Sequence, residues 1–243
     1  MTTSVATTID LNCDLGVWHA AGDEALFEVV TAANVACGDP RAMRRACEAA
    51  IKRGVSVGAH VGYRAGFLDV DPDDLVDDLL YQLGALDAIA GTAGGEVRYV
   101  KPHGALYNAV ATHDGHASAV VEAVWRYDPQ MPLLGRPASQ LFAHAREAGL
   151  VTVAEAFPDR GYLPDGRLAS GWEPGAMLSD PAEVARRCVR LVTEGRLEAV
   201  DGSVVELRPG SLCLYGDTPG AVAIATAVRE ALAHAGVQLR SFA

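Results

Sequence analysis

A cation, an imidazole, a phenol and an amide share one short segment, Val100-Lys101-Pro102-His103-Gly104-Ala105-Leu106-Tyr107-Asn108. The apolar run 97–100, broken only by Arg98, precedes this segment and is typical of a buried strand. Pro102 and Gly104 interrupt regular structure directly after it. Parallel α/β proteins present their chemistry where strands end in this way. The segment therefore predicts an enzyme site at the carboxyl edge of a sheet.

Strand-like and helix-like stretches alternate along the whole chain, with about seven such units and no linker or low-complexity tract. Helix starts are marked by an aspartate followed by proline at 39–40, 71–72 and 180–181, the residues preferred at the N-cap and first helical position. This alternation is typical of a parallel sheet covered by helices. We expect an α/β fold with one domain over residues 1–243. A seven-stranded (β/α)-barrel suits the count better than a doubly wound sheet, which stays open as an alternative.

A second kind of element interrupts this alternation near the carboxyl end. The run 199–205 contains Asp201-Gly202, the dipeptide that favours a tight turn between antiparallel strands. We therefore expect one β-hairpin beside the parallel sheet.

Composition excludes several classes of protein. The 243 residues carry a formal net charge of −11, which repels phosphate backbones and argues against nucleic-acid partners. No apolar run is long enough to span a bilayer, and residues 1–8 lack the features of a signal peptide, so we expect a cytoplasmic protein with no membrane partner. No glycine-rich nucleotide motif occurs, which argues against a nucleotide site of the Rossmann or P-loop type.

The five cysteines are odd in number and lack C-x-x-C spacing, which argues against a disulfide framework or a structural zinc site. Cys13, Cys37 and Cys213 lie in apolar runs and are expected to behave as small buried hydrophobic residues.

Polar residues concentrate where the predicted strands end. Asp10, Asn12 and Asp14 alternate along the first strand, so all three side chains point to one side of it. Polar groups on a buried strand are costly unless they are paired or functional, although a solvated sheet edge would also explain them. The later strands end in further candidates, which are Asn34, His60, Lys101, His103, Asp159, Arg160, Tyr162 and Asp217. Any one of them could be a satisfied core group, but their convergence at one edge favours an active site.

Two local arrangements suggest specific chemistry. Asp14, His60 and His103 could ligate one divalent metal ion together with water. Asp159 and Arg160 could pair, and the Arg160 guanidinium could then anchor a carboxylate or phosphate group.

Taken together, these residues resemble the LamB/YcsF family. The stretches that carry the resemblance are Asp10-Leu-Asn-Cys-Asp-Leu-Gly16, Asn34-Val-Ala-Cys-Gly38, Gly58-Ala-His60, Val100–Asn108, Asp159-Arg-Gly-Tyr162 and Gly216-Asp217. The resemblance covers nearly the whole chain. It implies a barrel related to the glycoside hydrolase/deacetylase group. It also implies ATP-dependent opening of 5-oxo-L-proline to L-glutamate, with ATP used in a complex with the 5-oxoprolinase subunits B and C.

A lactam is stabilised by resonance, so its opening needs an activated water molecule and a polarised or phosphorylated carbonyl group. Under this resemblance Asp14 is the candidate general base or a metal ligand, and His60 and His103 are acid–base or ligand groups. Lys101 and Arg160 stabilise the oxyanion or hold the substrate carboxylate. The catalytic set is then Asp14, His60, Lys101, His103 and Asp159, and the substrate-binding set is Asn12, Asn34, Asn108, Arg160, Tyr162 and Asp217.

The chain departs from the family pattern in four places. The glutamate and glycine-rich turn that follow Gly16 in the family are missing, as is the F-H-A-G that follows Gly38. The loop after His60 is shortened, and Tyr215 stands where a histidine usually precedes the last motif. Either the chain is a diverged paralogue with a trimmed site, or the intact protein has loop residues beyond these 243 and a mass above 25.4 kDa.

Two other functions stay open on the sequence. The chain could be a stand-alone metal-dependent deacetylase or hydrolase of a carbohydrate-like substrate. It could also be a non-catalytic paralogue that kept the fold and lost the chemistry.

Overall fold

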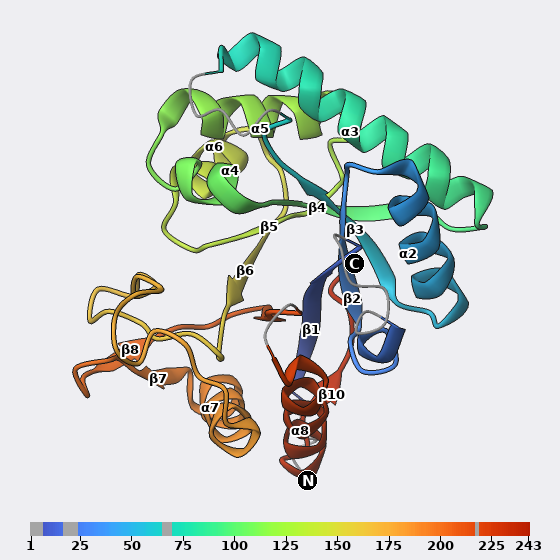
Figure 1. Cartoon of the computed structure of the whole chain (residues 1–243). Coiled ribbons are helices and arrows are strands. Elements are labelled where there is room, and N and C mark those ends of the chain that lie inside the picture. Colours follow the sequence, from blue (N-terminus) through green and yellow to red (C-terminus); the bar gives the residue numbers. More distant parts are fainter. Residues whose placement is uncertain (1–6, 17–23, 65–69, 217–218) are drawn as a thin grey trace, which may run out of the picture.

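The parallel strands form a closed barrel in the computed structural model, which describes residues 7–16, 24–64, 70–216 and 219–243 (Figure 1). Neighbouring strands in the sheet follow chain order from β1 to β6 and then β9, and β9 pairs with β1 to close the ring. The seven strands are β1 (Thr8–Leu15), β2 (Ala32–Ala36), β3 (Ser56–Val61), β4 (Val97–Pro102), β5 (Leu133–Gly135), β6 (Thr152–Ala156) and β9 (Ser211–Leu214). The expected seven-stranded (β/α)-barrel is confirmed, and the doubly wound alternative is wrong.

Helices cover the outside of the barrel (Figure 1). They are α2 (Pro40–Lys52), α3 (Pro72–Thr92), α4 (Gly104–Ala109), α5 (Asp114–Tyr127), α6 (Gln140–Glu147), α7 (Pro181–Glu194) and α8 (Ala221–His234). Asp39, Asp71 and Asp180 each accept backbone N–H groups of the first helical turn, as their sequence context predicts. The expected break at Pro102 and Gly104 is wrong in detail, because Pro102 is the last residue of β4 and Gly104, with a φ of +56°, is already the first residue of α4. Only His103, the N-cap of α4, lies between the two elements.

The hairpin near the carboxyl end is also confirmed. β7 (Arg196–Glu198) and β8 (Val204–Glu206) pair antiparallel outside the barrel, next to α7 (Figure 1). A further short strand, β10 (Gln238–Leu239), pairs parallel with the start of β1 and had no counterpart in the sequence analysis. Its two residues are too few to give a periodic signal.

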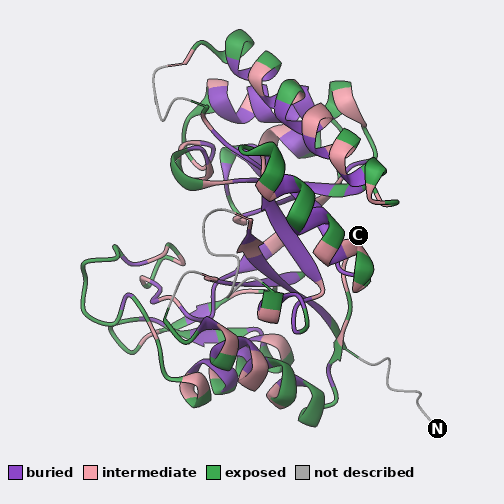
Figure 2. Ribbon diagram, turned by 45° about the vertical axis from the view of Figure 1, so that its right-hand side comes forward, coloured by how far each residue is buried: buried purple, intermediate pink, exposed green. Residues whose placement is uncertain are grey.

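The chain end fills the base of the barrel. The Phe242 ring packs edge-on against Tyr99, with ring centroids 4.9 Å apart, and Ser56 Oγ donates to the carbonyl oxygen of Ala243. Ala32 and Leu134 complete this apolar layer. Buried residues otherwise run along the barrel strands and the inner faces of the helices, while exposed residues lie on the outside (Figure 2). None of the described helices is long and apolar enough to cross a membrane.

Gly58 on β3 makes room for the Tyr99 ring inside the barrel. A Cβ atom at Gly58 would lie 2.1 Å from Cζ of Tyr99, far inside van der Waals contact. The Tyr99 hydroxyl in turn donates to Asn34 Oδ1 at 2.6 Å. The absence of a side chain at Gly58 therefore sets the position of a polar contact in the barrel interior.

Gly58→Ala is expected to lower the free energy of unfolding by about 1–3 kcal/mol, because a packed core must shift to accept the added methyl group. Denaturant unfolding followed by circular dichroism measures the change. Gly84→Ala is the matched control, since nothing lies within 4 Å of its added Cβ atom on α3. That control should be neutral or more stable by up to about 1 kcal/mol, the usual gain for alanine over glycine within a helix. Equal stabilities for the two variants would contradict the packing argument.

Candidate active site

A chain of hydrogen bonds runs up the inside of the barrel along β1. Ser211 Oγ donates to Asp10, and Asn12 Nδ2 donates to Ser211 Oγ at 2.6 Å. Asn34 Nδ2 then donates to Asn12 Oδ1 and to Asp14 Oδ1, both at 2.7 Å. Asp10 is 1% exposed and Asn12 is fully buried, so the alternating row faces the interior and the solvated-edge explanation is wrong. The network holds the Asp14 carboxylate at the top of the barrel.

Asp10 makes folding sensitive to pH. Burial raises the pKa of Asp10 to about 6, despite hydrogen bonds from Ser211 and Thr31. The folded chain then binds a proton more tightly than the unfolded chain between about pH 4 and 6, so the free energy of unfolding falls as pH rises through that window.

We expect this fall to reach at most about 3 kcal/mol for Asp10 alone. Asp10→Asn has no ionisable side chain at this position, so its free energy of unfolding should depend less on pH than that of the wild type. Urea unfolding at several pH values from 4 to 7 tests this. Identical slopes for the two proteins would contradict it.

Lys101 lies at the centre of a buried charge cluster. Its Nζ atom lies 3.1 Å from Asp14 Oδ1, 3.0 Å from Glu155 Oε2 and 3.2 Å from Cys213 Sγ. Burial alone would lower the pKa of Lys101, but Asp14, Cys213 and Glu155 together raise it well above its ordinary value. The ammonium group therefore stays charged although its side chain is only 2% exposed.

Two members of this cluster correct the sequence analysis. Glu155 was not proposed as a site residue, although it is the only charged residue in β6. Cys213 was expected to be a plain hydrophobic residue, yet its sulfur contacts the Lys101 ammonium. Sequence spacing gave no signal for that contact, because the two residues are 112 positions apart.

Asp14 remains ionised in this setting. Burial raises its pKa, but the His60 ring, the Lys101 ammonium and the hydrogen bond from Asn34 outweigh burial and hold the pKa below its usual range. Because His60 is itself neutral near pH 7, the positive charge that lowers the pKa of Asp14 comes from Lys101. A carboxylate held this strongly ionised is a weak base, so the geometry favours an electrostatic role for Asp14 over general-base catalysis.

Two imidazole rings stand side by side above this cluster. The ring centroids of His60 and His103 are 4.8 Å apart, and His60 Nε2 lies 3.6 Å from Asp14 Oδ1. Burial lowers the pKa of His60 to about 3 and also lowers the pKa of His103. Both rings are therefore neutral near pH 7, but a pKa this low makes His60 a weak base, which leaves His103 as the better proton acceptor.

The backbone at Gly62 sets the position of His103. A Cβ atom at Gly62 would lie 2.4 Å from His103 Nε2, so the ring packs directly on bare backbone. Gln82 on α3 is buried and bonds both backbone groups of Gly62, accepting from its N–H at 3.0 Å and donating to its carbonyl at 2.8 Å. Gln82, from the outer helix α3, thus holds the Gly62 backbone against which the His103 ring packs.

The described side chains do not fit a metal ion as they are arranged. No group of three or more His, Cys, Asp or Glu residues in the described ranges is placed to hold one. The Lys101 ammonium also contacts Asp14 Oδ1, the oxygen nearest His60. The metal expectation for Asp14, His60 and His103 gains no support from this geometry, and no step below uses a metal.

Asp159 and Arg160 follow β6 but do not pair with each other, which corrects the sequence expectation. Asp159 Oδ2 instead accepts the backbone N–H of Tyr215 at 3.0 Å. Burial raises the pKa of Asp159 to about 6. The Arg160 guanidinium lies over the Tyr215 ring, 4.7 Å from its centroid, and no described carboxylate lies within ion-pair distance of it. Within the described part of the chain, Arg160 therefore has a ring contact but no ion pair.

These groups surround one cavity of about 360 Å³ at the carboxyl end of the barrel. Its lining includes the side-chain cluster of Asp14, His60, Lys101 and His103 and also residues 168–171. Four further residues line the cavity that were not predicted from the sequence, namely Tyr107, Arg136, Phe157 and Tyr215. Tyr107 lies in the stretch Val100–Asn108 from which the site was predicted. Arg136 follows β5, whose three residues are too short to mark a strand end clearly.

Buried side-chain atoms without a hydrogen-bond partner gather at this same cavity. Among the described residues, three such nitrogen atoms belong to residues that line the cavity, namely His60 Nδ1, Arg136 Nε and Arg160 Nε. Glu155 interacts with both Lys101 and Tyr107, so these side chains already have partners. Asp159 Oδ1 also lacks a partner, but Asp159 does not line the cavity. Unpaired polar atoms are costly in a folded protein unless a ligand or water satisfies them. The cavity is therefore built to receive a polar ligand.

The other predicted binding residues fall in different places. Asn12 and Asn34 are fully buried beneath the cavity and contact Asp14 directly or through each other, so they position a site residue and do not line the site. Tyr162 is also buried, and its hydroxyl accepts the backbone N–H of Phe157. Asn108 is exposed and does line the cavity. Asp217 lies outside the described residues.

Comparisons with known proteins agree with this geometry. The sequence pattern of the LamB/YcsF family matches residues 9–243. The A-subunit of 5-oxoprolinase from Mycolicibacterium paratuberculosis is 52% identical over 248 residues, covering 96% of this chain and 98% of that protein. The protein of the same name from Kocuria rhizophila is 51% identical, and the match covers 98% of this chain and 100% of that protein. Because 248 aligned positions cover only 96% of 243 residues, the first relative has segments with no counterpart here.

Solved structures give the same picture. A lactam utilization protein from Thermus thermophilus is 40% identical, covers 97% of this chain and 100% of its own, and superposes with a TM-score of 0.90. A family 4 carbohydrate esterase from Streptomyces lividans is 11% identical, covers 99% of this chain and 95% of its own, and has a TM-score of 0.54. The second likeness extends to the fold alone.

Proposed function

This chain belongs to the LamB/YcsF family, and we propose that it is the A-subunit of an ATP-dependent 5-oxoprolinase. In this role it opens 5-oxo-L-proline hydrolytically to L-glutamate, together with subunits B and C. The observation that carries the proposal is the cavity into which unpaired polar groups converge. The names of relatives that cover nearly the whole chain support the choice of a lactam as substrate.

Hydrolysis of a lactam requires water to attack the carbonyl carbon and the carbon–nitrogen bond to break. The water loses a proton, and the departing ring nitrogen gains one. His103 is neutral, partly exposed and at the cavity wall, which suits it to accept the proton from water. The same ring, once protonated, is placed to return that proton to the departing nitrogen, whereas Asp159 is buried and does not line the cavity.

Charge develops on the carbonyl oxygen as water attacks. The Lys101 ammonium lies at the cavity wall and stays charged, so it stabilises that oxygen. Asp14 and Glu155 hold the ammonium in place, and the His60 ring lies beside both Asp14 and His103. ATP enters through the partner subunits in this proposal, because the chain lacks Rossmann and P-loop motifs.

Arg136 and Arg160 are suited to bind the carboxylate of the substrate. Each guanidinium lies over a tyrosine ring, Arg136 over Tyr107 and Arg160 over Tyr215. Each keeps a buried Nε atom without a partner. A guanidinium that contacts an aromatic ring keeps N–H groups for a carboxylate, which its fork of donors can bind in bidentate fashion.

Arg160→Ala is expected to raise KM for 5-oxoproline about 10- to 100-fold, the loss of one charged hydrogen-bonding pair, with a smaller effect on kcat. Steady-state kinetics of the reconstituted complex measures both constants. Arg167→Ala is the control, since Arg167 lies on the same segment, is exposed and pairs with Asp165. A change in kcat with KM untouched would place Arg160 elsewhere in the mechanism.

The function itself is tested by mixing the purified chain with subunits B and C from the same organism. We expect glutamate release from 5-oxoproline that requires ATP and all three subunits. Release by the chain alone without ATP would overturn the proposal. Activity toward N-acetylated sugars would favour a deacetylase, and inactivity in every complex would favour a non-catalytic paralogue.

A further inference from the structure

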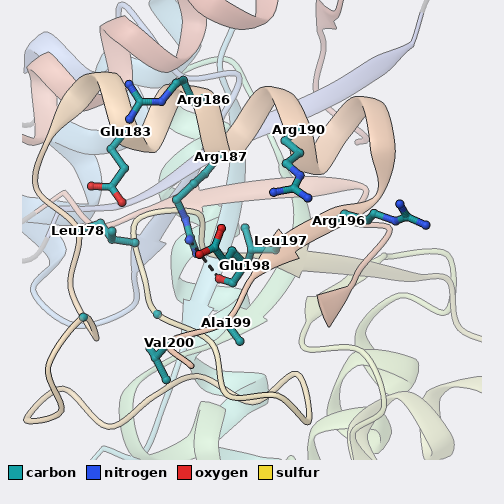
Figure 3. Close-up of a pocket in the computed structure, with 12 residues that line it drawn as sticks. Leu178, Glu183, Arg186, Arg187, Arg190, Arg196, Leu197, Glu198, Ala199 and Val200 are labelled. Carbon is teal, nitrogen blue, oxygen red and sulfur yellow. Dashed lines mark hydrogen bonds between the residues drawn. The ribbon is translucent and has the colours of Figure 1, made fainter. Parts of the chain in front are cut away.

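Arg187 on α7 makes hydrogen bonds that hold the turn after β6. Its Nε atom donates to the carbonyl oxygen of Pro158 at 3.1 Å, and one terminal nitrogen donates to the carbonyl oxygen of Arg160 at 3.2 Å. The other terminal nitrogen donates to the carbonyl oxygen of Glu198 on β7 at 3.1 Å. Figure 3 shows Arg187 extending from α7 to Glu198. One guanidinium therefore joins the helix, the hairpin and the turn.

Neighbouring arginines in the same cleft bond differently (Figure 3). Arg190 pairs with Glu194 on its own helix at 3.4 Å. Arg196 pairs with Glu206 across the β7–β8 hairpin at 3.7 Å. These two ion pairs stay within one helix and one hairpin, whereas Arg187 bonds a segment that leads to the catalytic cavity at the carboxyl end of the barrel.

The turn after β6 has its backbone carbonyl groups bonded from two sides. Those of Pro158 and Arg160 accept from Arg187, whereas those of the next residue in each case accept N–H groups of the segment 168–178, both at 2.9 Å. A buried carbonyl group without a partner is costly, and Pro158 is buried. Without Arg187, two of these four carbonyl groups would lose the partner shown here, so the shape of the turn depends on that side chain.

This turn carries a residue of the catalytic cavity. Arg160 lines the cavity, and its guanidinium lies 4.7 Å from the centroid of the Tyr215 ring. Its buried Nε atom has no partner among the described residues. Arg187 lies in the neighbouring cleft and does not line the cavity itself. It therefore reaches the cavity only through the backbone that it holds.

We propose that Arg187 is a positioning residue for substrate binding and acts through Arg160. This inference rests on the proposed function, in which Arg160 binds the carboxylate of the lactam substrate. Arginine carries five N–H donors in a fixed planar fork, which suits three carbonyl oxygens at once. A lysine would keep the charge but offer its donors from a single nitrogen atom. The fork, and not the charge, places Arg160 against its ligand.

Steady-state kinetics of the reconstituted complex tests this role. Arg187→Met is expected to raise KM for 5-oxoproline about 5- to 20-fold and to change kcat less than about threefold, because substrate binding loses its orientation. Arg187→Lys should raise KM to within about twofold of that value. Arg190→Met is the matched control on the same helix, and its KM should stay within about twofold of wild type. Thermal unfolding checks that every variant is folded at the assay temperature.

A second background identifies the residue through which Arg187 acts. In Arg160→Ala, adding Arg187→Met should raise KM by less than about twofold, because the positioned residue is already gone. An equally large rise in both backgrounds would overturn the proposal. A wild-type KM in Arg187→Met would overturn it too, and a wild-type KM in Arg187→Lys would assign the effect to charge and reject the fork.

Equilibrium binding separates this inference from the proposed function. Isothermal titration calorimetry of the complex with 5-oxoproline, in the absence of ATP, measures Kd. Both Arg187 variants should weaken binding by the same factor by which they raise KM. Binding that both variants weaken, without glutamate release from any complex, would reject the proposed function and leave the positioning role intact. A wild-type complex that does not bind 5-oxoproline would overturn both.

Discussion

Lys101→Met is expected to lower the free energy of unfolding by about 3–5 kcal/mol and to abolish activity in the reconstituted complex. The substitution keeps most of the side-chain volume but removes the charge that Asp14 and Glu155 share. The buried Glu155 carboxylate and the partly exposed Asp14 carboxylate would then both lose their shared cation. Denaturant unfolding and the glutamate-release assay measure the two effects.

Two further variants make this expectation specific. Lys52→Met is the matched control, since Lys52 is exposed at the end of α2 and is the only other lysine in the chain. Adding Asp14→Asn and Glu155→Gln to Lys101→Met removes all three charges, which should restore most of the stability but none of the activity. A triple variant as unstable as the single one would show that shape, and not charge, makes Lys101 important.

His103→Ala is expected to lower kcat by about 10²–10⁴-fold, the usual contribution of a positioned acid–base group. Stability should change little, because the His103 side chain makes no capping hydrogen bond at α4 and is only partly buried. His234→Ala is the control, as His234 is exposed at the end of α8. Kinetics of the two complexes at saturating partner measure the difference.

The pH profile distinguishes a base from a structural role for His103. The wild-type kcat/KM should fall as pH drops through the pKa of His103, which burial places below its ordinary value of 6.5. That acid limb should disappear in His103→Ala, and added imidazole should restore part of the rate. An unchanged acid limb in the variant would assign the proton transfer to another group.

The intact mass of the protein bears on both experiments. The departures from the family pattern follow Gly16, Gly38 and His60, and the nearby Asp14 and His60 line the catalytic cavity. A mass of 25.4 kDa would mean that the activity rests on these 243 residues. A heavier protein would bring further groups to the same cavity.

Much of the architecture follows from local sequence. Aspartate–proline pairs fix the starts of α2, α3 and α7, because the side chain caps free N–H groups and proline lacks the N–H that would need a partner. The alternation of Asp10, Asn12 and Asp14 fixes which face of β1 looks inward, because strand side chains alternate sides. Lys101 and His103 are found because they lie at the carboxyl end of β4, which the apolar run 97–100 predicts.

Only the tertiary structure decides what these residues do. Asp14 looks like a base in the sequence, but three strands bring Asn34, His60 and Lys101 to it and hold its pKa low. Glu155, Arg136 and Cys213 join the site through contacts between distant parts of the chain, for which periodicity carries no signal. Local patterns determine where a strand ends and which way it faces. Burial and the identity of a charged neighbour arise only when the barrel closes, and these set the protonation states of Asp14, His60, Lys101 and His103.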